Sequence, residues 1–200
     1  MNVERGCTDP GLAGGTGEWS LRALLDYVDR VHQAGVPVIW QPYARTARQR
    51  EYNLACLLLT RRGRDLLADQ DARPSRWWAG FDIDPGAPAG GRYDWQELIR
   101  RDFTRAIVLL NPPGEPARTV ELDGRYVRVD GTAVPTTLTV RGGRAFVLLR
   151  KLSPSRGRQA RIVTPWTSPP TALKIRSRAS PAVGHPSASA RDASRLRHRP

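Results

Sequence analysis

Residues 36–68 read VPVIWQPYARTARQREYNLACLLLTRRGRDLLA. The apolar run at 36–40 predicts a short strand that is buried on both faces. Thr46 and Gln49 have the spacing of a capping box, so we expect a helix to begin there. Residues 65–68 predict a second strand. A strand, a helix and a strand at this spacing are typical of a parallel α/β unit.

The residues before this unit predict the same alternation of strands and helices. Residues 2–3 are interpreted as the end of a strand, with Glu4 directly after it. Ser20 is a good helix cap, and apolar residues recur behind it at helical spacing until Gly35. We therefore expect residues 1–75 to form strands and helices in alternation.

The spacing of apolar residues changes from helical to strand-like in the second part of the chain. Between residues 103 and 150, short apolar runs are separated by Asp123-Gly124, Asp130-Gly131 and Gly142-Gly143. Such dipeptides predict hairpin turns, so we expect the strands on either side of 123–124 and of 142–143 to pair in a small antiparallel β-sandwich. Residues 76–102 are expected to be an aromatic and acidic loop and linker.

Basic residues are concentrated at the end of the chain. Residues 151–200 contain eleven Lys or Arg and one acidic residue, whereas residues 1–150 contain 21 basic and 18 acidic residues. The last fifty residues have eight Ser, seven Pro and no apolar period, so we expect a disordered basic tail. Three interpretations of this segment stay open: a solvated tail or linker, an electrostatic contact with nucleic acid or an anionic membrane, and the product of out-of-frame translation.

Other features of the sequence narrow the class of protein. Cys7 and Cys56 give neither a disulfide framework nor a metal-ligand spacing, and Cys56 is expected to be a core residue. The chain has no run of about 20 apolar residues and no apolar segment typical of a signal peptide near residue 1. We expect no cofactor, no metal and no membrane span. The localisation stays open, because a longer parent protein could carry a signal upstream.

Polar residues follow each predicted strand of the first 75 residues. Glu4 follows the first, Tyr43 and Arg45 follow the second, and Asp69 follows the third. In an α/β barrel, the loops at these positions build the active site. The alternative for each acid is a solvated loop carboxylate or a helix cap.

A loop rich in aromatic and acidic residues comes soon after. Glycosidic bond cleavage needs one acid that protonates the leaving oxygen and a second that acts as base or nucleophile. Aromatic faces pack against sugar rings. The expected catalytic residues are Glu4, Asp82 and Asp84, and the expected substrate-binding residues are Tyr43, Arg45, Asp69, Trp77 and Trp78.

Several segments together resemble one family. They are NVERG and TDPGL at 2–12, EWS and LDY at 18–27, YART and QREY at 43–52, WW, GFDID and GAP at 77–88, and RDF and VLLNP at 101–112. Over residues 2–150 the chain resembles the late-barrel segment of bacterial glycoside hydrolase-like proteins of the hypothetical glycosyl hydrolase family 15 type. The resemblance implies a (β/α)₈ barrel, a small β-sandwich and the hydrolysis of glycosides. Glu4 matches a glutamate at a strand end.

A whole barrel of this kind takes about 250 residues, and only about 75 are present here before the loop. We therefore expect an α/β plus all-β fold: the C-terminal part of an incomplete (β/α)₈ barrel, a small antiparallel β-sandwich and a disordered tail. The expected function is that of a truncated glycoside hydrolase with a carbohydrate substrate. One alternative is a non-catalytic carbohydrate-binding module. The other is nucleic-acid contact through the basic tail, which we do not expect because the sequence of the tail shows no fold typical of nucleic-acid binding.

Overall fold

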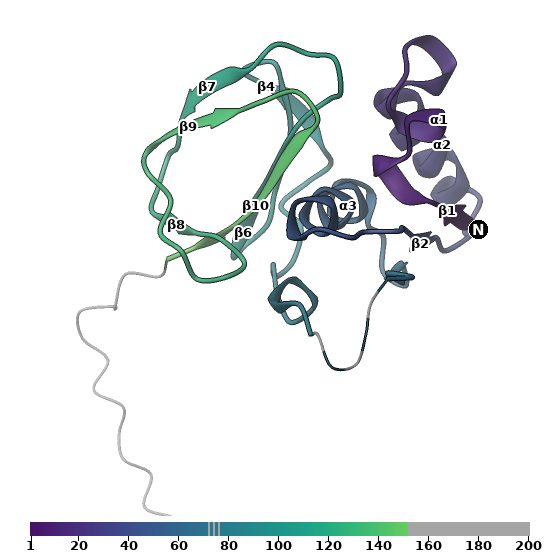
Figure 1. Cartoon of the computed structure of the whole chain (residues 1–200), viewed down its shortest axis with the longest axis horizontal. Helices are drawn as coiled ribbons and strands as arrows, with labels where there is room; N and C mark the ends of the chain where they lie inside the picture. Colours follow the sequence, from purple (N-terminus) through teal and green to yellow (C-terminus); the bar gives the residue numbers. More distant parts are fainter. Residues whose placement is uncertain (72, 74, 76, 152–200) are drawn as a thin grey trace, which may run out of the picture. The chain divides into compact units, whose positions relative to one another are not determined.

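Three short strands near the beginning of the chain form a parallel sheet in the computed structural model (Figure 1). The structure describes residues 1–71, 73, 75 and 77–151. The strands are β1 (Asn2–Glu4), β2 (Ile39–Gln41) and β3 (Leu66–Leu67), in the order β1-β2-β3. The three strands predicted in this part of the chain are confirmed, with boundaries that differ by up to three residues.

Two helices connect the three strands. The helix α2 (Leu21–Gln33) begins behind Ser20, whose hydroxyl accepts a hydrogen bond from the Ala23 amide. The helix α3 (Ala47–Thr60) begins behind Thr46, which forms the predicted capping box with Gln49. Both predicted caps are confirmed. Three shorter helices lie between β1 and α2: η1 (Gly6–Thr8), α1 (Pro10–Ala13) and η2 (Gly17–Trp19).

The parallel sheet buries one face and exposes the other. Val3 and Trp40 are buried in a core that also contains residues of α2 and α3. Ile39 and Leu66, whose side chains belong to the opposite face, are 40% and 59% exposed. The prediction that 36–40 is buried on both faces is wrong, because successive side chains of a strand alternate and the two helices cover one face.

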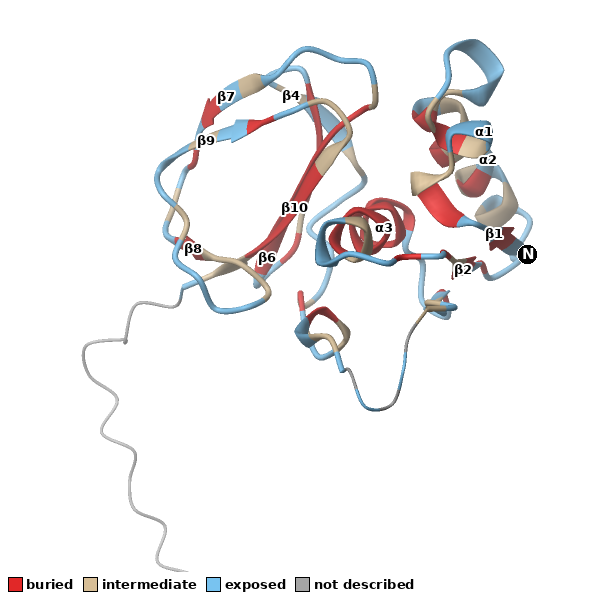
Figure 2. Cartoon of the chain, viewed as in Figure 1, coloured by how far each residue is buried: buried red, intermediate tan, exposed pale blue. Residues whose placement is uncertain are grey.

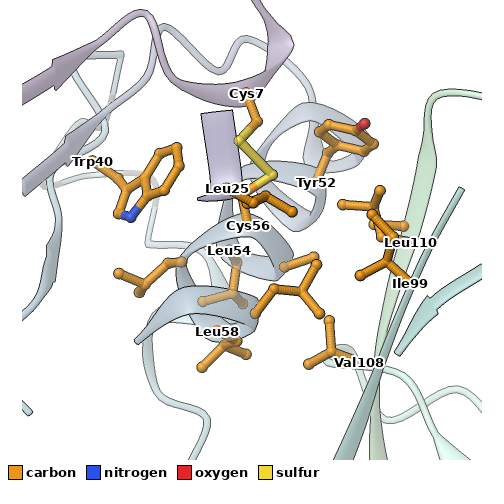
Figure 3. Close-up of a cluster of buried hydrophobic side chains, with 14 of the residues drawn as sticks. Cys7, Leu25, Trp40, Tyr52, Leu54, Cys56, Leu58, Ile99, Val108 and Leu110 are labelled. Carbon is orange, nitrogen blue, oxygen red and sulfur yellow. A yellow bond between two sulfur atoms is a disulfide. The ribbon is translucent and has the colours of Figure 1, made fainter. Parts of the chain in front are cut away.

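The helix α3 is buried along most of its length (Figure 2). Every residue from 51 to 60 is buried, which leaves this part of the helix without a solvent face. Leu54 and Leu58 lie in one cluster with Trp40 of the parallel sheet and with Val108 and Leu110 of a second sheet (Figure 3). The two sheets therefore share α3 as part of their core.

The second sheet is antiparallel and has five strands. In spatial order these are β4 (Tyr93–Trp95), β5 (Leu98–Asp102), β6 (Ala106–Asn111), β10 (Arg144–Arg150) and β8 (Tyr126–Val127). One face of this sheet packs on α3. The other face contributes to a separate apolar cluster with a two-stranded sheet of β7 (Arg118–Glu121) and β9 (Thr137–Val140). A short helix, η3 (Ala79–Phe81), precedes β4.

Two predicted hairpins are wrong. The strands beside 123–124 do not pair with each other, since β7 pairs with β9 and β8 pairs with β10. The strands beside 142–143, β9 and β10, belong to different sheets. The Asp123 carboxylate accepts hydrogen bonds from the Tyr126 hydroxyl (2.6 Å) and from Arg100 (3.2 Å). These side-chain bonds and the burial of Val120 and Val140 outweigh the local turn signal.

The segment 76–102 was expected to be loop and linker, but it contains β4 and β5. The turn between them consists of Gln96 and Glu97, both with left-handed backbone angles (φ 49° and 63°). Gly or Asn usually fills such positions, so the sequence carries no signal for this hairpin.

Cys7 and Cys56 form a disulfide between η1 and α3 (Figure 3). The prediction that the two cysteines make no disulfide framework is therefore wrong, whereas the core position of Cys56 is confirmed. Their sequence separation of 49 gives no hint of the pairing, because the contact depends on how the loop after β1 lies on α3.

The predicted basic tail lies outside the described residues, apart from Lys151. In the part of the chain that the structure describes, no helix is both long enough and apolar enough to cross a membrane.

The open face of the parallel sheet predicts self-association. Exposed apolar surface binds hydrophobic dyes and promotes association. We expect dye binding and light scattering to fall when Ile39 and Leu66 are both replaced by Thr, which keeps strand propensity. The exposed Val36, which lies outside β2, is the matched control: Val36→Thr should change neither signal. A monodisperse wild-type monomer that binds no dye would contradict this expectation.

Glu51 is a carboxylate buried between α3 and β10. It accepts a hydrogen bond from the Val147 amide (3.3 Å) and lies 3.7 Å from the Arg144 guanidinium. Burial raises the pKa of Glu51 above its usual range. The folded state therefore binds this proton more tightly than the unfolded chain does. Its contribution to stability is complete below the unfolded pKa and is lost as the pH rises through the folded pKa.

We expect Glu51→Gln to remove this pH-dependent loss. The amide keeps an acceptor for the Val147 amide and has no charge to bury. Tm should rise by roughly 1–4 °C at pH 8 and change less near pH 4. Thermal melts between pH 4 and pH 8 measure the effect, with the exposed Glu121→Gln as control. A larger gain at pH 4 than at pH 8 would show the opposite linkage.

Candidate functional site

The carboxyl ends of β1, β2 and β3 lead into three loops at one edge of the parallel sheet. Parallel α/β architectures place their chemistry at this edge. Glu4 ends β1 and is exposed. Its side chain belongs to the open face of the sheet, together with those of Asn2 and Gln41. The Asn2 amide group donates to the Gln41 side-chain oxygen (2.7 Å), which links β1 to β2 on this face.

The loop after Glu4 is fastened to α3. Arg5 and Gly6 both have left-handed backbone angles (φ 61° and 62°), and a Cβ at Gly6 would overlap the Asn53 side chain. The Asn53 side-chain oxygen accepts a hydrogen bond from the Cys7 amide (2.7 Å), and its NH₂ group donates to the Thr8 hydroxyl (3.2 Å). The Cys7–Cys56 disulfide holds the same loop. The position of Glu4 therefore depends on α3.

A cavity of about 400 Å³ opens beside this loop. Its lining includes Arg5, Asp9, Tyr43 and Gln49. Arg5 forms an ion pair with Asp9 (3.4 Å), and the side chain of Tyr43 is exposed. Arg45 is also exposed, and its backbone amide donates to the Gln49 side-chain oxygen (3.0 Å). The structure thus places the predicted residue Tyr43 next to Arg5, which the sequence analysis did not select.

Asp69 serves as a structural anchor in this site. Its side chain is 1% exposed and accepts a hydrogen bond from the Arg50 guanidinium (2.7 Å). The same carboxylate accepts from the backbone amides of Ala44 (3.4 Å) and Asp71 (3.0 Å). It therefore ties the loop after β2 to the loop after β3, and little of it is available to a substrate.

Trp77, Trp78 and Asp82 lie together. The Trp77 side chain is 66% exposed, and its indole N–H donates to the Asp82 carboxylate (2.5 Å). Both indoles pack edge-on against Phe81, with ring centroids 5.2 and 5.3 Å apart. Trp77 and Phe81 line a largely apolar cavity of about 470 Å³ that also includes Leu66 and Leu67 of β3. These aromatic residues therefore lie beside the open edge of the parallel sheet.

Asp84 lies neither with Tyr43 nor with the Trp77 cluster. It is exposed, accepts a hydrogen bond from the Gly86 amide (2.8 Å) and pairs with Arg105. These two interactions hold the pKa of Asp84 below its usual range. A carboxylate that stays ionised is poorly suited to be a general acid. Asp84 borders a cavity of about 420 Å³ with Arg61 and Arg101. This cavity shares Arg61 with the Trp77 cavity and no residue with the Tyr43 cavity.

The chemistry available to this site comes from its carboxylates, its arginines and its aromatic rings. Within the described ranges, no group of three or more His, Cys, Asp or Glu side chains could hold a metal ion. Comparison with protein-family models and with curated protein sequences finds no match to this chain.

Asn53 gives a direct test of how the loop after Glu4 is held. Asn53→Ala leaves the buried Cys7 amide without its acceptor, which should cost about 1–3 kcal/mol of the free energy of unfolding. The exposed Asn2→Ala is the control and should change it by less than about 0.5 kcal/mol. Urea denaturation measures both values, and hydrogen exchange reports on the Cys7 amide. Unchanged protection of that amide in Asn53→Ala would refute this role.

Proposed function

We propose that the parallel sheet belongs to a (β/α)₈ barrel of a carbohydrate-active, glycoside hydrolase-like protein, of which this chain carries the C-terminal part. The open face of the sheet supports the proposal. Parallel sheets are normally covered on both faces, whereas Ile39 and Leu66 are exposed here. In a closed barrel, this face would line the interior.

The arrangement of the strands and helices agrees with the same proposal. The strands follow one another in sequence order, and α2 and α3 contribute to the core on the same side of the sheet. Barrels are wound in this way, with all helices on the outside. Among the described residues, β1 and β3 each pair with β2 alone, so each has a free edge for a further strand.

The catalytic part of the proposal depends on the position of Glu4. It lies at the carboxyl end of β1 on the open face, and it forms no ion pair with any described residue. In a closed barrel, such a carboxylate would face the substrate as base, nucleophile or acid. Asp69 and Asp84 are engaged by arginines, so we expect the second catalytic group on a strand that this chain lacks. The chain alone would then be incomplete as an enzyme.

A second candidate function is carbohydrate binding without hydrolysis. The exposed Trp77 indole, which Asp82 holds by its N–H, offers a flat apolar face of the kind that packs against a sugar ring. Turnover of an aryl glycoside by the full-length parent protein separates the two functions, because a binding module gives none.

Nucleic-acid contact is a third alternative, and it depends on residues 151–200, which lie outside the described part of the chain apart from Lys151. A steep salt dependence of binding that disappears when these residues are deleted would support it.

The proposal predicts the effect of Glu4→Gln in the full-length parent protein. Glutamine keeps the size of the side chain but can neither exchange the proton nor act as a carboxylate nucleophile. The kcat for a cleaved glycoside should fall at least roughly a hundredfold. Asp82→Asn and Asp84→Asn should have smaller effects or raise KM, and Tm controls for folding. Near-wild-type kcat in Glu4→Gln, together with an inactive Asp82 or Asp84 variant, would contradict the assignment of Glu4. The catalytic residues would then belong to the loop at 80–95.

A further inference from the structure

A further cavity, of about 530 Å³, lies at the N-terminal end of α3. Its lining includes Thr8, Thr46, Arg48, Gln49 and Tyr52. It adjoins the Tyr43 cavity, because both include Thr8 and Gln49. Neither the expected catalytic residues nor the expected substrate-binding residues lie in its lining.

The Tyr52 hydroxyl in this cavity lacks a partner. The residue is 3% exposed, and its hydroxyl forms no hydrogen bond with any described residue. Buried polar groups are normally paired, so the unpaired hydroxyl of a residue in this lining is a candidate donor to a ligand. Burial also raises the pKa of Tyr52 above its usual range, which keeps the hydroxyl protonated as a donor at neutral pH.

Two positive features lie close to this hydroxyl. Arg48 precedes Tyr52 by four residues and therefore shares a face of α3 with it. The Arg48 guanidinium donates to the Gly143 carbonyl oxygen (3.2 Å) and forms no ion pair within the described residues. Side chains of a helix lean toward its N-terminus, so the Tyr52 ring extends toward the positive end of the helix dipole.

We propose that this cavity binds the oxyanion of a small ligand, with the Tyr52 hydroxyl and the Arg48 guanidinium as donors at the N-terminus of α3. The helix has 14 residues, which is long enough for its N-terminus to attract an anion. The cavity is larger than a phosphate ion, and Pro10 and Pro113 in its wall offer apolar contact to the body of an organic ligand. This site is independent of glycoside hydrolysis at Glu4.

Tyr52→Phe tests the proposal, because it removes the hydroxyl and keeps the ring. Without added anion, we expect Tm to stay equal or to rise, since an unpaired buried hydroxyl is lost. Titration of the full chain with inorganic phosphate at low ionic strength should raise the Tm of the wild type. Calorimetry should show a Kd at least about tenfold weaker in Tyr52→Phe and in Arg48→Gln. The exposed Tyr27→Phe and Arg125→Gln are the matched controls and should leave Kd unchanged.

Acetate, titrated in parallel, identifies the type of oxyanion. Binding of phosphate alone assigns a phosphate group, and binding of acetate alone assigns a carboxylate. Binding of neither anion overturns the proposal. Equal affinity in the wild type, Tyr52→Phe and Arg48→Gln also overturns it, because the anion then binds elsewhere, for example at the basic residues of 151–200. Glu4→Gln should keep the wild-type affinity, so loss of hydrolysis and loss of this site are distinguishable.

Discussion

The burial of α3 between two sheets is the constraint on which the rest of the structure depends. Ten consecutive residues of this helix, 51–60, have almost no contact with solvent. A helix that is buried on all sides must be covered by different elements on different faces. The parallel sheet and α2 lie in the same apolar cluster as α3, and so does one face of the antiparallel sheet. Neither sheet has a complete core without the helix.

The same constraint explains where the polar residues of the site are found. Glu51, Tyr52 and Asn53 follow one another on the buried part of α3, and each polar group there needs a partner. Asn53 satisfies its groups with the loop that follows Glu4, and Glu51 accepts a bond from β10. Tyr52 lines a cavity, and its hydroxyl has no partner among the described residues. The helix thus both positions the candidate catalytic loop and creates the proposed anion site.

Much of the local structure could be predicted from the sequence, because its signals are local. Ser20 and Thr46 cap helices through their own side chains, and short apolar runs marked the second and third parallel strands. The strand pairing in the antiparallel part could not be predicted in this way. Asp123-Gly124 has the form of a hairpin turn, yet long-range packing and the bonds of Asp123 to Tyr126 and Arg100 decide the pairing.

The candidate site was predictable to a smaller extent. Strand order directed attention to Glu4 and Tyr43, which lie at the carboxyl edge of the parallel sheet. The role of Asp69 could not be predicted, because its partner Arg50 reaches it only after folding. The signals in the sequence for the support of the loop were the polar Asn53 directly before the apolar run 54–59 and Gly6 after Glu4. They become meaningful only with the contact between the loop and α3.

Leu58→Ala, read by native-state hydrogen exchange, tests most directly whether α3 unites the two sheets. Leu58 is buried in the shared cluster, and its truncation should cost about 2–5 kcal/mol. If α3 is a common core, the protected amides of β2 and of β6 should lose the same free energy of protection. A loss confined to one sheet, with the other unchanged, would show that the two sheets are stabilised independently and would contradict the account.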